Sequence, residues 1–474
     1  MNRKDLCRTQ QTCRATQCCV AAPGQRLAFG KSRILHLMLK GFVGLLLILS
    51  PCAVCAQSEF ARRLPDDRPQ LNPDQLSRAG LRVLRSKHLV LVTDIPAVDV
   101  AGLPQLADSL YLQLCRELGT PAAAADDAEF QVTGYLMDAP ERFGDAGLLP
   151  PQRYVIRHGR HLGYQFWMRN QTTDYYRRHL LLHEFVHCFM MCETGMRDIP
   201  PLWFTEGIAE YYATHEQQPF RAGIVPARQQ GFEGWGRIGE LTEQLRQEGS
   251  EILLRDVLKP NRRIFESELH YAQGWAMYWL IRTHPELRDE FQLLTGVRSR
   301  GQFDRAVARL SPQTIARMQI VWLLVLDSLT EGFDVDRSFP ELDPPWREWT
   351  AGEDRQLNVR ADRGWQPSGV SSSTAMSIKI VAEARCILRQ EGGDWVSEPQ
   401  GITIDYVAGS PLGELQAMAV PREPASAPQR LRIGRQSTIS IPANSELWLR
   451  INDLESSRAE NSGGYRVQLT AVEE

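Results

Sequence analysis

The chain has 474 residues, more than one ordinary hydrophobic core accommodates, so we expect two or three domains. Hydrophobic residues make up 43% and charged residues 23% of the sequence, a mixture typical of folded proteins that excludes bulk disorder. The formal net charge is −3, so the chain as a whole has no excess of positive charge.

The first 56 residues have the order of a secretory signal peptide. Lys40 precedes a short apolar run over residues 41–50, and the small residues 53–56 follow it. This order predicts cleavage after Ala56 and a secreted or periplasmic protein. Because a transmembrane helix needs roughly 20 apolar residues, we expect no integral membrane segment after cleavage. The compact length of such a peptide favours Met38 as the true start.

Removing residues 1–56 changes the charge and the cysteine count. The segment holds eight basic residues and one acidic residue, so the remainder keeps 46 basic and 56 acidic residues, a net charge of −10 that argues against nucleic acid as a partner. Six of the ten cysteines also lie there, and the remaining four are too few for a disulfide scaffold. Cys188 and Cys192 share a helix face and are interpreted as small buried hydrophobes, with a metal contact or a disulfide as alternatives. The alternative for the N-terminal segment is a lipoprotein signal, with a lipid attached at Cys52 or Cys55.

The segment after the leader begins with a linker and continues with alternating elements. Residues 57–79, rich in Pro, Asp and Arg, are the predicted linker. The pattern then predicts, in chain order, a β-rich stretch over 81–95, a helix over 103–118, a strand over 130–136 and a pair of strands within 153–169. Such alternation is typical of an α/β unit, which we place at residues 80–230.

Two helices are predicted next in this unit. The first runs over residues 174–194, begins beside the candidate caps Thr172 and Thr173 and stops at Gly195. The second follows Pro200 and Pro201 and runs over residues 203–214. A helical lobe is then expected over 231–350, from apolar stripes in 252–257, 272–281 and 315–329.

The C-terminal part is expected to be an all-β domain. Proline and acidic residues at 339–346 and a Gly/Ser-rich stretch at 368–373 mark a boundary, so we expect a linker over 351–372 and a β-sandwich over 373–474. Its strand candidates are 377–382, 401–406, 431–433, 438–441, 447–451 and 465–469. The expected fold class is therefore α+β multidomain: an α/β domain with a helical second lobe, followed by an all-β sandwich.

One pentapeptide in the first of the two helices suggests a metal site. His183-Glu184-Phe185-Val186-His187 places two imidazoles four residues apart, hence on one helix face, where both can bind one zinc ion. Glu184 lies about 100° around the helix from His183, so it flanks the metal and can take a proton from water. Because such a pentapeptide can arise by chance, the alternative is a helix whose histidines pack against a core.

The following helix supplies a third ligand candidate. Glu206 lies eighteen intervening residues beyond His187, in the phrase Trp203-Phe204-Thr205-Glu206-Gly207-Ile208-Ala209. This arrangement resembles the gluzincin metallopeptidases, the class of thermolysin and aminopeptidase N, and is most similar to uncharacterised secreted bacterial proteins of that kind. The resemblance implies a zincin domain, zinc held by His183, His187 and Glu206, and Glu184 as general base.

The aminopeptidase N branch adds a further expectation. There a tyrosine far downstream of the third ligand stabilises the oxyanion, which implies that role for Tyr271, 65 residues past Glu206. A core aromatic is the alternative for Tyr271, and His270 is a weaker substitute for the role. Glu210 is left open between a carboxylate that orients a ligand imidazole and a surface charge. His179 is interpreted as a packed or solvated histidine.

These observations predict a secreted zinc metallopeptidase with peptide or protein substrates. The aminopeptidase segment Gly-x-Met-Glu-Asn is absent from the sequence, which favours an endopeptidase, and the strand 163–169 is expected to bind an extended peptide by β-addition. The alternative is a non-catalytic cell-surface or glycan-binding protein in which the zincin module is structural.

The end of the chain carries a second resemblance. Residues 447–453 followed by 460–465 resemble the calcium-binding end of bacterial galactophilic lectins. The resemblance implies calcium ligands at Asp453, Glu460 and Asn461, whose oxygen atoms suit that ion, and a glycan partner. Residues 401–417 hold no histidine, although those lectins place one against the sugar there. A polar turn between two strands is the alternative.

Overall fold

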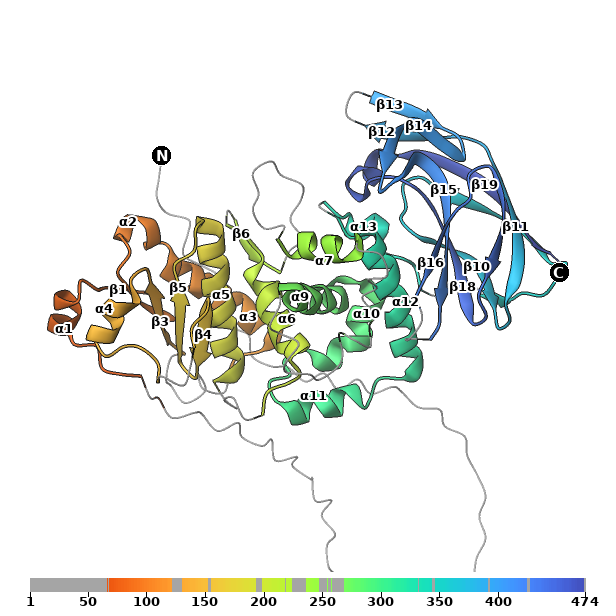
Figure 1. The fold of residues 1–474 in the computed structure, drawn as a ribbon. Coiled ribbons are helices and arrows are strands. Elements are labelled where there is room, and N and C mark those ends of the chain that lie inside the picture. Colours follow the sequence, from red (N-terminus) through yellow and green to blue (C-terminus); the bar gives the residue numbers. More distant parts are fainter. Residues whose placement is uncertain are drawn as a thin grey trace, which may run out of the picture. The chain divides into compact units, whose positions relative to one another are not determined.

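The computed structural model describes residues 66, 68–121, 130–151, 155–192, 198–217, 219–223, 236–246, 254, 257, 268–330, 332–342, 346–390, 393–423 and 427–472. The predicted signal peptide, its cleavage site and the proposed start lie outside these residues. The α+β class is confirmed, with an α/β region first in the chain and an all-β region last (Figure 1). None of the described helices combines the length and the apolar character needed to cross a bilayer.

The N-terminal region contains a five-stranded sheet. Its strands are β1 (Arg82–Arg85), β2 (Leu89–Thr93), β3 (Val132–Met137), β4 (Gly159–Leu162) and β5 (Gln165–Arg169), in the order β1-β2-β3-β5-β4. The central three run parallel, and β1 and β4 pair antiparallel at the two edges. Every residue of β2 and β3 is buried, as expected for central strands whose faces are both covered.

The position of β5 corrects one expectation. We expected the strand 163–169 to bind an extended peptide, but β5 pairs with β3 on one side and with β4 on the other. The backbone N–H and C=O groups of β5 therefore already pair with its two neighbours, and a peptide cannot add to this strand. The edge strand beside it is β4, whose second edge pairs with no other strand in the described part of the chain.

The two motif-bearing helices form where predicted. Helix α5 (Asp174–Met191) begins at Thr173, whose side chain accepts a hydrogen bond from the Tyr176 backbone N–H. Of the expected extension to residue 194, Cys192 is the C-cap that follows the helix, and residues 193–194 are not described. Helix α6 (Leu202–Ala213) follows Pro201, as the sequence suggested.

Shorter and later elements complete the N-terminal α/β region and the helical region that follows it. The expected linker 57–79 is partly helical, because residues 73–78 form a short helix. The other helices and strands are α1 (Pro73–Arg78), α2 (Ala97–Val100), α3 (Leu103–Leu118), α4 (Pro140–Asp145), β6 (His215–Gln217), β7 (Phe220–Ala222), α7 (Gly236–Arg246), α9 (Glu268–Thr283), α10 (Pro285–Glu290), the 3-10 helix η3 (Phe291–Leu294), α11 (Arg300–Val307), α12 (Pro312–Ser328) and α13 (Val335–Ser338).

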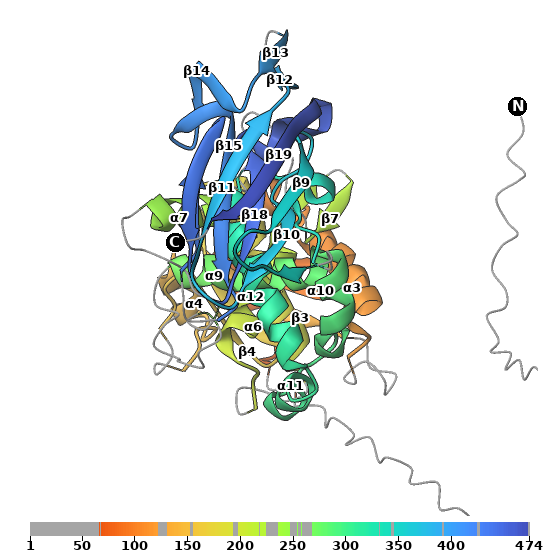
Figure 2. The ribbon, with the colours of Figure 1, turned by 90° about the vertical axis from the view of Figure 1, so that its right-hand side faces the viewer.

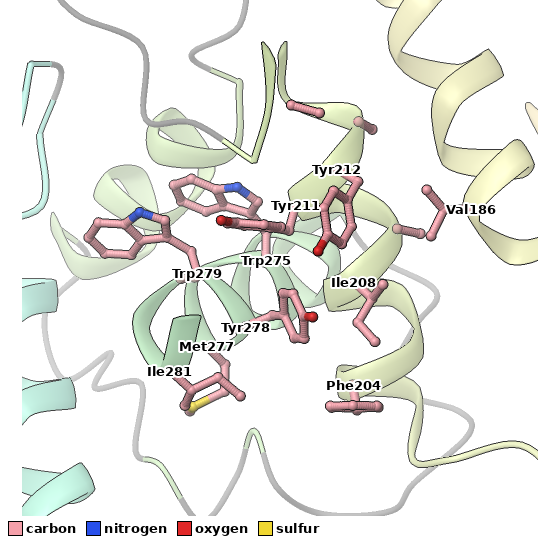
Figure 3. Close-up of a cluster of buried hydrophobic side chains, with 14 of the residues drawn as sticks. Val186, Phe204, Ile208, Tyr211, Tyr212, Trp275, Met277, Tyr278, Trp279 and Ile281 are labelled. Carbon is pink, nitrogen blue, oxygen red and sulfur yellow. The ribbon is translucent and has the colours of Figure 1, made fainter. Parts of the chain in front are cut away.

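Helices α6 and α9 pack closely because glycines meet at their crossing. A Cβ atom added to Gly207 would lie 2.4 Å from the Gly274 carbonyl oxygen, so a side chain there would force the helices apart. Around this contact, aromatic side chains of both helices fill the core (Figure 3). This packing fixes α6 against α9 and so sets the position of the functional side chains that both helices carry.

The C-terminal region consists of two six-stranded sheets that enclose one core (Figure 2). One sheet has the order β14-β15-β18-β10-β8 with β16 beside β15, and the other β13-β12-β19-β11-β17 with β9 beside β19. The strands are β8 (Arg347–Glu348), β9 (Asp354–Arg360), β10 (Gln366–Ser372), β11 (Met376–Glu383), β12 (Cys386–Gln390), β13 (Gly393–Ser397), β14 (Gln400–Val407), β15 (Ser410–Pro421), β16 (Gln429–Arg432), β17 (Gln436–Ile441), β18 (Ser445–Ile451) and β19 (Ser462–Val472), with the 3-10 helix η4 (Glu455–Glu460) before the last.

This β region begins earlier than the sequence suggested. Residues 351–372, expected to be a linker, contain β9, which pairs with β19, and β10, which pairs with β18 and β8. These strands were not predicted because most of their residues are polar or small. Gly369 of β10 has a positive φ and the register shifts there, so the strand is irregular as well as polar.

Candidate metal centre

Helices α5 and α6 bring the predicted ligands together. His187 Nε2 lies 3.0 Å from His183 Nε2 and 3.1 Å from Glu206 Oε2, and His183 Nε2 lies 3.3 Å from that same oxygen. Among the described residues these three form a group whose ligand atoms lie within 4.8 Å of one another. The pentapeptide and the glutamate of the next helix therefore meet at one point, as the sequence predicted.

The donor set fits zinc. Two imidazole nitrogens and one carboxylate oxygen are zinc ligands, and tetrahedral ligands about 2.0–2.1 Å from zinc lie roughly 3.3 Å from each other. The distances between the three atoms agree with that spacing. The side chains are also well buried, with exposed fractions of 8% for His183, 2% for His187 and 14% for Glu206. Three residues of this kind would leave a fourth position for water.

The charges at the centre favour an ionised Glu206. Burial opposes the charge, but the imidazoles of His187 and His183 outweigh it and lower the pKa of Glu206 below its usual value. Burial alone would lower the pKa of His183, whereas the carboxylates of Glu206 and Glu210 raise it to about 10. A carboxylate that stays ionised is what a metal ligand requires.

Glu210 belongs to the site and not to the surface. It is 2% exposed, and its Oε1 lies 3.1 Å from His183 Nδ1, the ring nitrogen that does not face the other ligands. Arg237 of α7 contacts the same carboxylate twice, with Nε at 2.8 Å and Nη2 at 2.9 Å. The surface-charge alternative is therefore wrong, and Glu210 is a buried carboxylate in a position to orient the imidazole of His183.

Two other histidines of this region, His179 and His215, lie outside the group of His183, His187 and Glu206. His179 Nε2 lies 3.0 Å from Glu210 Oε2 and packs inside the protein. His215 stacks on Tyr175 with ring centroids 4.9 Å apart. Cys188 and Cys192 are buried, and neither forms a disulfide with another described cysteine, which agrees with their interpretation as small buried hydrophobes.

Glu184 lies between the ligands and the edge strand β4. Its Oε2 lies 3.2 Å from His161 Nδ1, and a Cβ atom added to Gly159 would lie 2.0 Å from its Oε1. Burial opposes the negative charge, but His161 and the two ligand imidazoles together lower the pKa of Glu184. Glu184 is therefore an ionised carboxylate, held close to a strand on one side.

Tyr271 of α9 lies beside the same centre. Its ring centroid is 6.2 Å from that of His183, and the guanidinium of Arg237 lies over the ring at 5.5 Å. Burial, reinforced by the carboxylates of Glu206, Glu210 and Glu184, raises the pKa of the phenol, which therefore stays protonated and able to donate.

The sequence reasoning missed Gly159, His161 and Arg237. The first two belong to a four-residue strand, and nothing in their spacing says which strand face meets α5. Arg237 lies on α7, thirty-one positions before Glu268, with which it also forms an ion pair. The sequence offered one signal: residues 159 and 161 are two positions apart, so in a strand their side-chain positions lie on the same face.

Of the predicted calcium ligands, Asp453 follows β18, Glu460 is the last residue of η4, and Asn461 directly precedes β19. Asn461 Nδ2 donates a hydrogen bond to Asp453 Oδ2 at 2.7 Å, and Glu460 is exposed. The buried guanidinium of Arg458, paired with Glu455, lies close enough to Asp453 to interact with its charge. Calcium binding at this turn, and a glycan partner, stay predictions.

Comparison with known proteins shows a weak likeness to a lectin domain. No protein-family model and no curated protein matches the chain. Among solved structures, the chain is similar to the EclA N-terminal domain, a PllA-like lectin, with 20% identity over 24% of this chain and 94% of that one, at a TM-score of 0.20. A likeness at that score carries no argument about the present chain.

Proposed function

We propose that the protein is a zinc-dependent metallopeptidase of the gluzincin type. The observation that carries the proposal is the meeting of His183 Nε2, His187 Nε2 and Glu206 Oε2 within 3.0–3.3 Å, with the carboxylate of Glu184 on the next position of the same helix. A structural zinc site would have its four positions filled by protein ligands and no need of a neighbouring base.

The chain's own residues divide the chemistry of peptide hydrolysis among them. Bound zinc would polarise the peptide carbonyl and acidify a water molecule. Glu184 takes the proton of the attacking water and passes it to the leaving amine. Tyr271 donates a hydrogen bond to the oxygen on which negative charge develops.

An extended peptide is the substrate geometry that this site favours. The edge strand β4 lies next to Glu184, and an added strand along its unpaired edge would bring a backbone carbonyl close to the site. Pairing through the backbone needs no free amino terminus, so we propose an endopeptidase.

Removing the metal should abolish the activity. The purified protein should contain about one zinc ion per chain by elemental analysis and should cleave members of a mixed peptide library. A chelator should stop cleavage and added zinc should restore it. Protein that contains no metal, or cleavage that continues after the metal is removed, contradicts the proposal.

Replacing Tyr271 with phenylalanine should lower kcat about 100-fold and leave KM nearly unchanged, because the hydroxyl acts on charge that develops in the transition state. Steady-state kinetics on one cleaved peptide measure both constants. Tyr175→Phe is the matched control, since that buried phenol lies beside His215 and outside the ligand group. Equal kcat values in Tyr271→Phe and wild type would show that the hydroxyl takes no part in catalysis and that Tyr271 is a core aromatic.

A further inference from the structure

A buried histidine of the edge strand contacts the proposed general base. His161 and Gly159 are two residues apart on β4, so their side-chain positions share one face of the strand. That face meets α5. His161 Nδ1 lies 3.2 Å from Glu184 Oε2, and the two side chains are only 12% and 5% exposed.

Packing fixes the ring of His161 on a second side. Its ring stacks on that of His187 with centroids 4.2 Å apart and an interplanar angle of 27°. Turning the imidazole part-way about its Cβ–Cγ bond would break that stacking contact. The plane of the ring is therefore held by His187, and the hydrogen bond to Glu184 fixes which edge of the ring carries Nδ1 toward the carboxylate.

We propose that His161 is a positioning residue that orients the carboxylate of Glu184 for proton transfer. This inference rests on the proposed function, because it concerns the base of that reaction. The last torsion of a glutamate side chain has broad, shallow preferences, so a carboxylate that must face a water molecule needs a partner to hold it. Nδ1–H of His161 donates to Oε2, and the absence of a side chain at Gly159 leaves room for Oε1.

The assignment names one ring nitrogen. Donation from Nδ1 leaves Nε2 as an acceptor, and Nε2 is buried and has no hydrogen-bond partner among the described residues. His161 also lies outside the group of three residues whose ligand atoms converge. His161 could thus act in three distinct ways: by orienting Glu184 through Nδ1, by contacting the substrate or water through Nε2, or by binding the metal. Three variants at position 161 distinguish these roles.

The test compares leucine, asparagine and glutamine at position 161 in the full chain. His161→Leu removes the donor and should lower kcat about 100-fold, the cost of a misplaced catalytic group, with KM unchanged. His161→Asn places an amide donor near the position of Nδ1 and should recover most of kcat. His161→Gln reaches the position of Nε2 and should not.

Two metal measurements accompany the kinetics. Zinc affinity, measured by competition with a coloured chelator, should be the same in all three variants and in wild type. The visible absorption of the cobalt(II)-substituted protein, which reports the ligand set, should also be unchanged. Weaker zinc binding or an altered cobalt spectrum in His161→Leu would overturn the proposal by making His161 a ligand.

Other outcomes are equally decisive. Wild-type kcat in His161→Leu, or recovery by glutamine and not by asparagine, would overturn the assignment of Nδ1 while leaving the peptidase intact. If His161→Leu does not fold, the asparagine and glutamine variants decide between the two nitrogens. Wild-type protein that neither holds zinc nor cleaves peptide would overturn the proposed function and this inference together.

Discussion

Replacing Glu184 with glutamine should lower kcat by about 10²- to 10⁴-fold while zinc stays bound. Glutamine has nearly the same volume, and its amide oxygen can still accept from His161, which lies 3.2 Å from the carboxylate. The amide oxygen, however, cannot take a proton from water. The ligands His183, His187 and Glu206 are untouched, so elemental analysis should find the metal content of wild type.

Glu353→Gln is the matched control for this variant, because it makes the same chemical change at an exposed carboxylate on the β region. Its kcat and zinc content should equal those of wild type. Cleavage that persists in Glu184→Gln would remove Glu184 from the reaction. Loss of zinc from that variant would instead show that the carboxylate supports the metal site, and the kinetics could not then assign it as a base.

Replacing Asp327 with alanine should destabilise the protein by about 3 kcal/mol, the cost of leaving a buried charge without its partner. Asp327 lies near the end of α12, and its Oδ2 accepts from Arg450 Nη1 at 2.9 Å and from Trp365 Nε1 at 3.0 Å. It also forms an ion pair with Arg430. Arg450 is buried, and its guanidinium lies 4.4 Å from the Trp365 ring.

Urea denaturation followed by fluorescence would measure this loss as a lower midpoint at an unchanged slope. Asp304→Ala is the control, because the pair of Asp304 with Arg300 is about half exposed and should cost less than about 1 kcal/mol. A loss in Asp327→Ala no larger than in the control would show that the buried contact between α12 and the β strands contributes little to stability.

The elements that the sequence predicted well are those with a strong local signal. Helix α3 has the predicted bounds, because its apolar residues recur with helical spacing over four turns. Helix α5 begins at the predicted cap Thr173. By contrast, β9 and β10 were missed, because polar and small residues predominate in both strands and leave too few apolar residues to mark a strand in the sequence.

β15 (Ser410–Pro421) was missed for the opposite reason. All twelve of its residues are buried, including Glu414 and Gln416, so no polar face alternates with an apolar one. It packs between β14 and β18 while its outer face is covered. A strand covered on both faces cannot be recognised from alternation, and two polar residues interrupt the continuous apolar run that would otherwise mark it.

The sequence by itself determined the candidate metal ligands and the candidate base. His183, Glu184 and His187 follow from helical spacing, which is a local property, and Glu206 follows from its place on the next helix. Their meeting at one point depended only on two helices packing side by side. The short range of these relations is why the sequence sufficed.

Only the tertiary structure decided what surrounds that centre. Glu210 was ambiguous until its burial beside His183 and Arg237 was seen, because the exposure of a charged residue depends on elements distant in the chain. His161 and Gly159 gained their meaning from the packing of β4 over α5, which brings residues about 25 positions apart into contact. Contacts between elements depend on which faces meet, and residue spacing within one element does not contain that information.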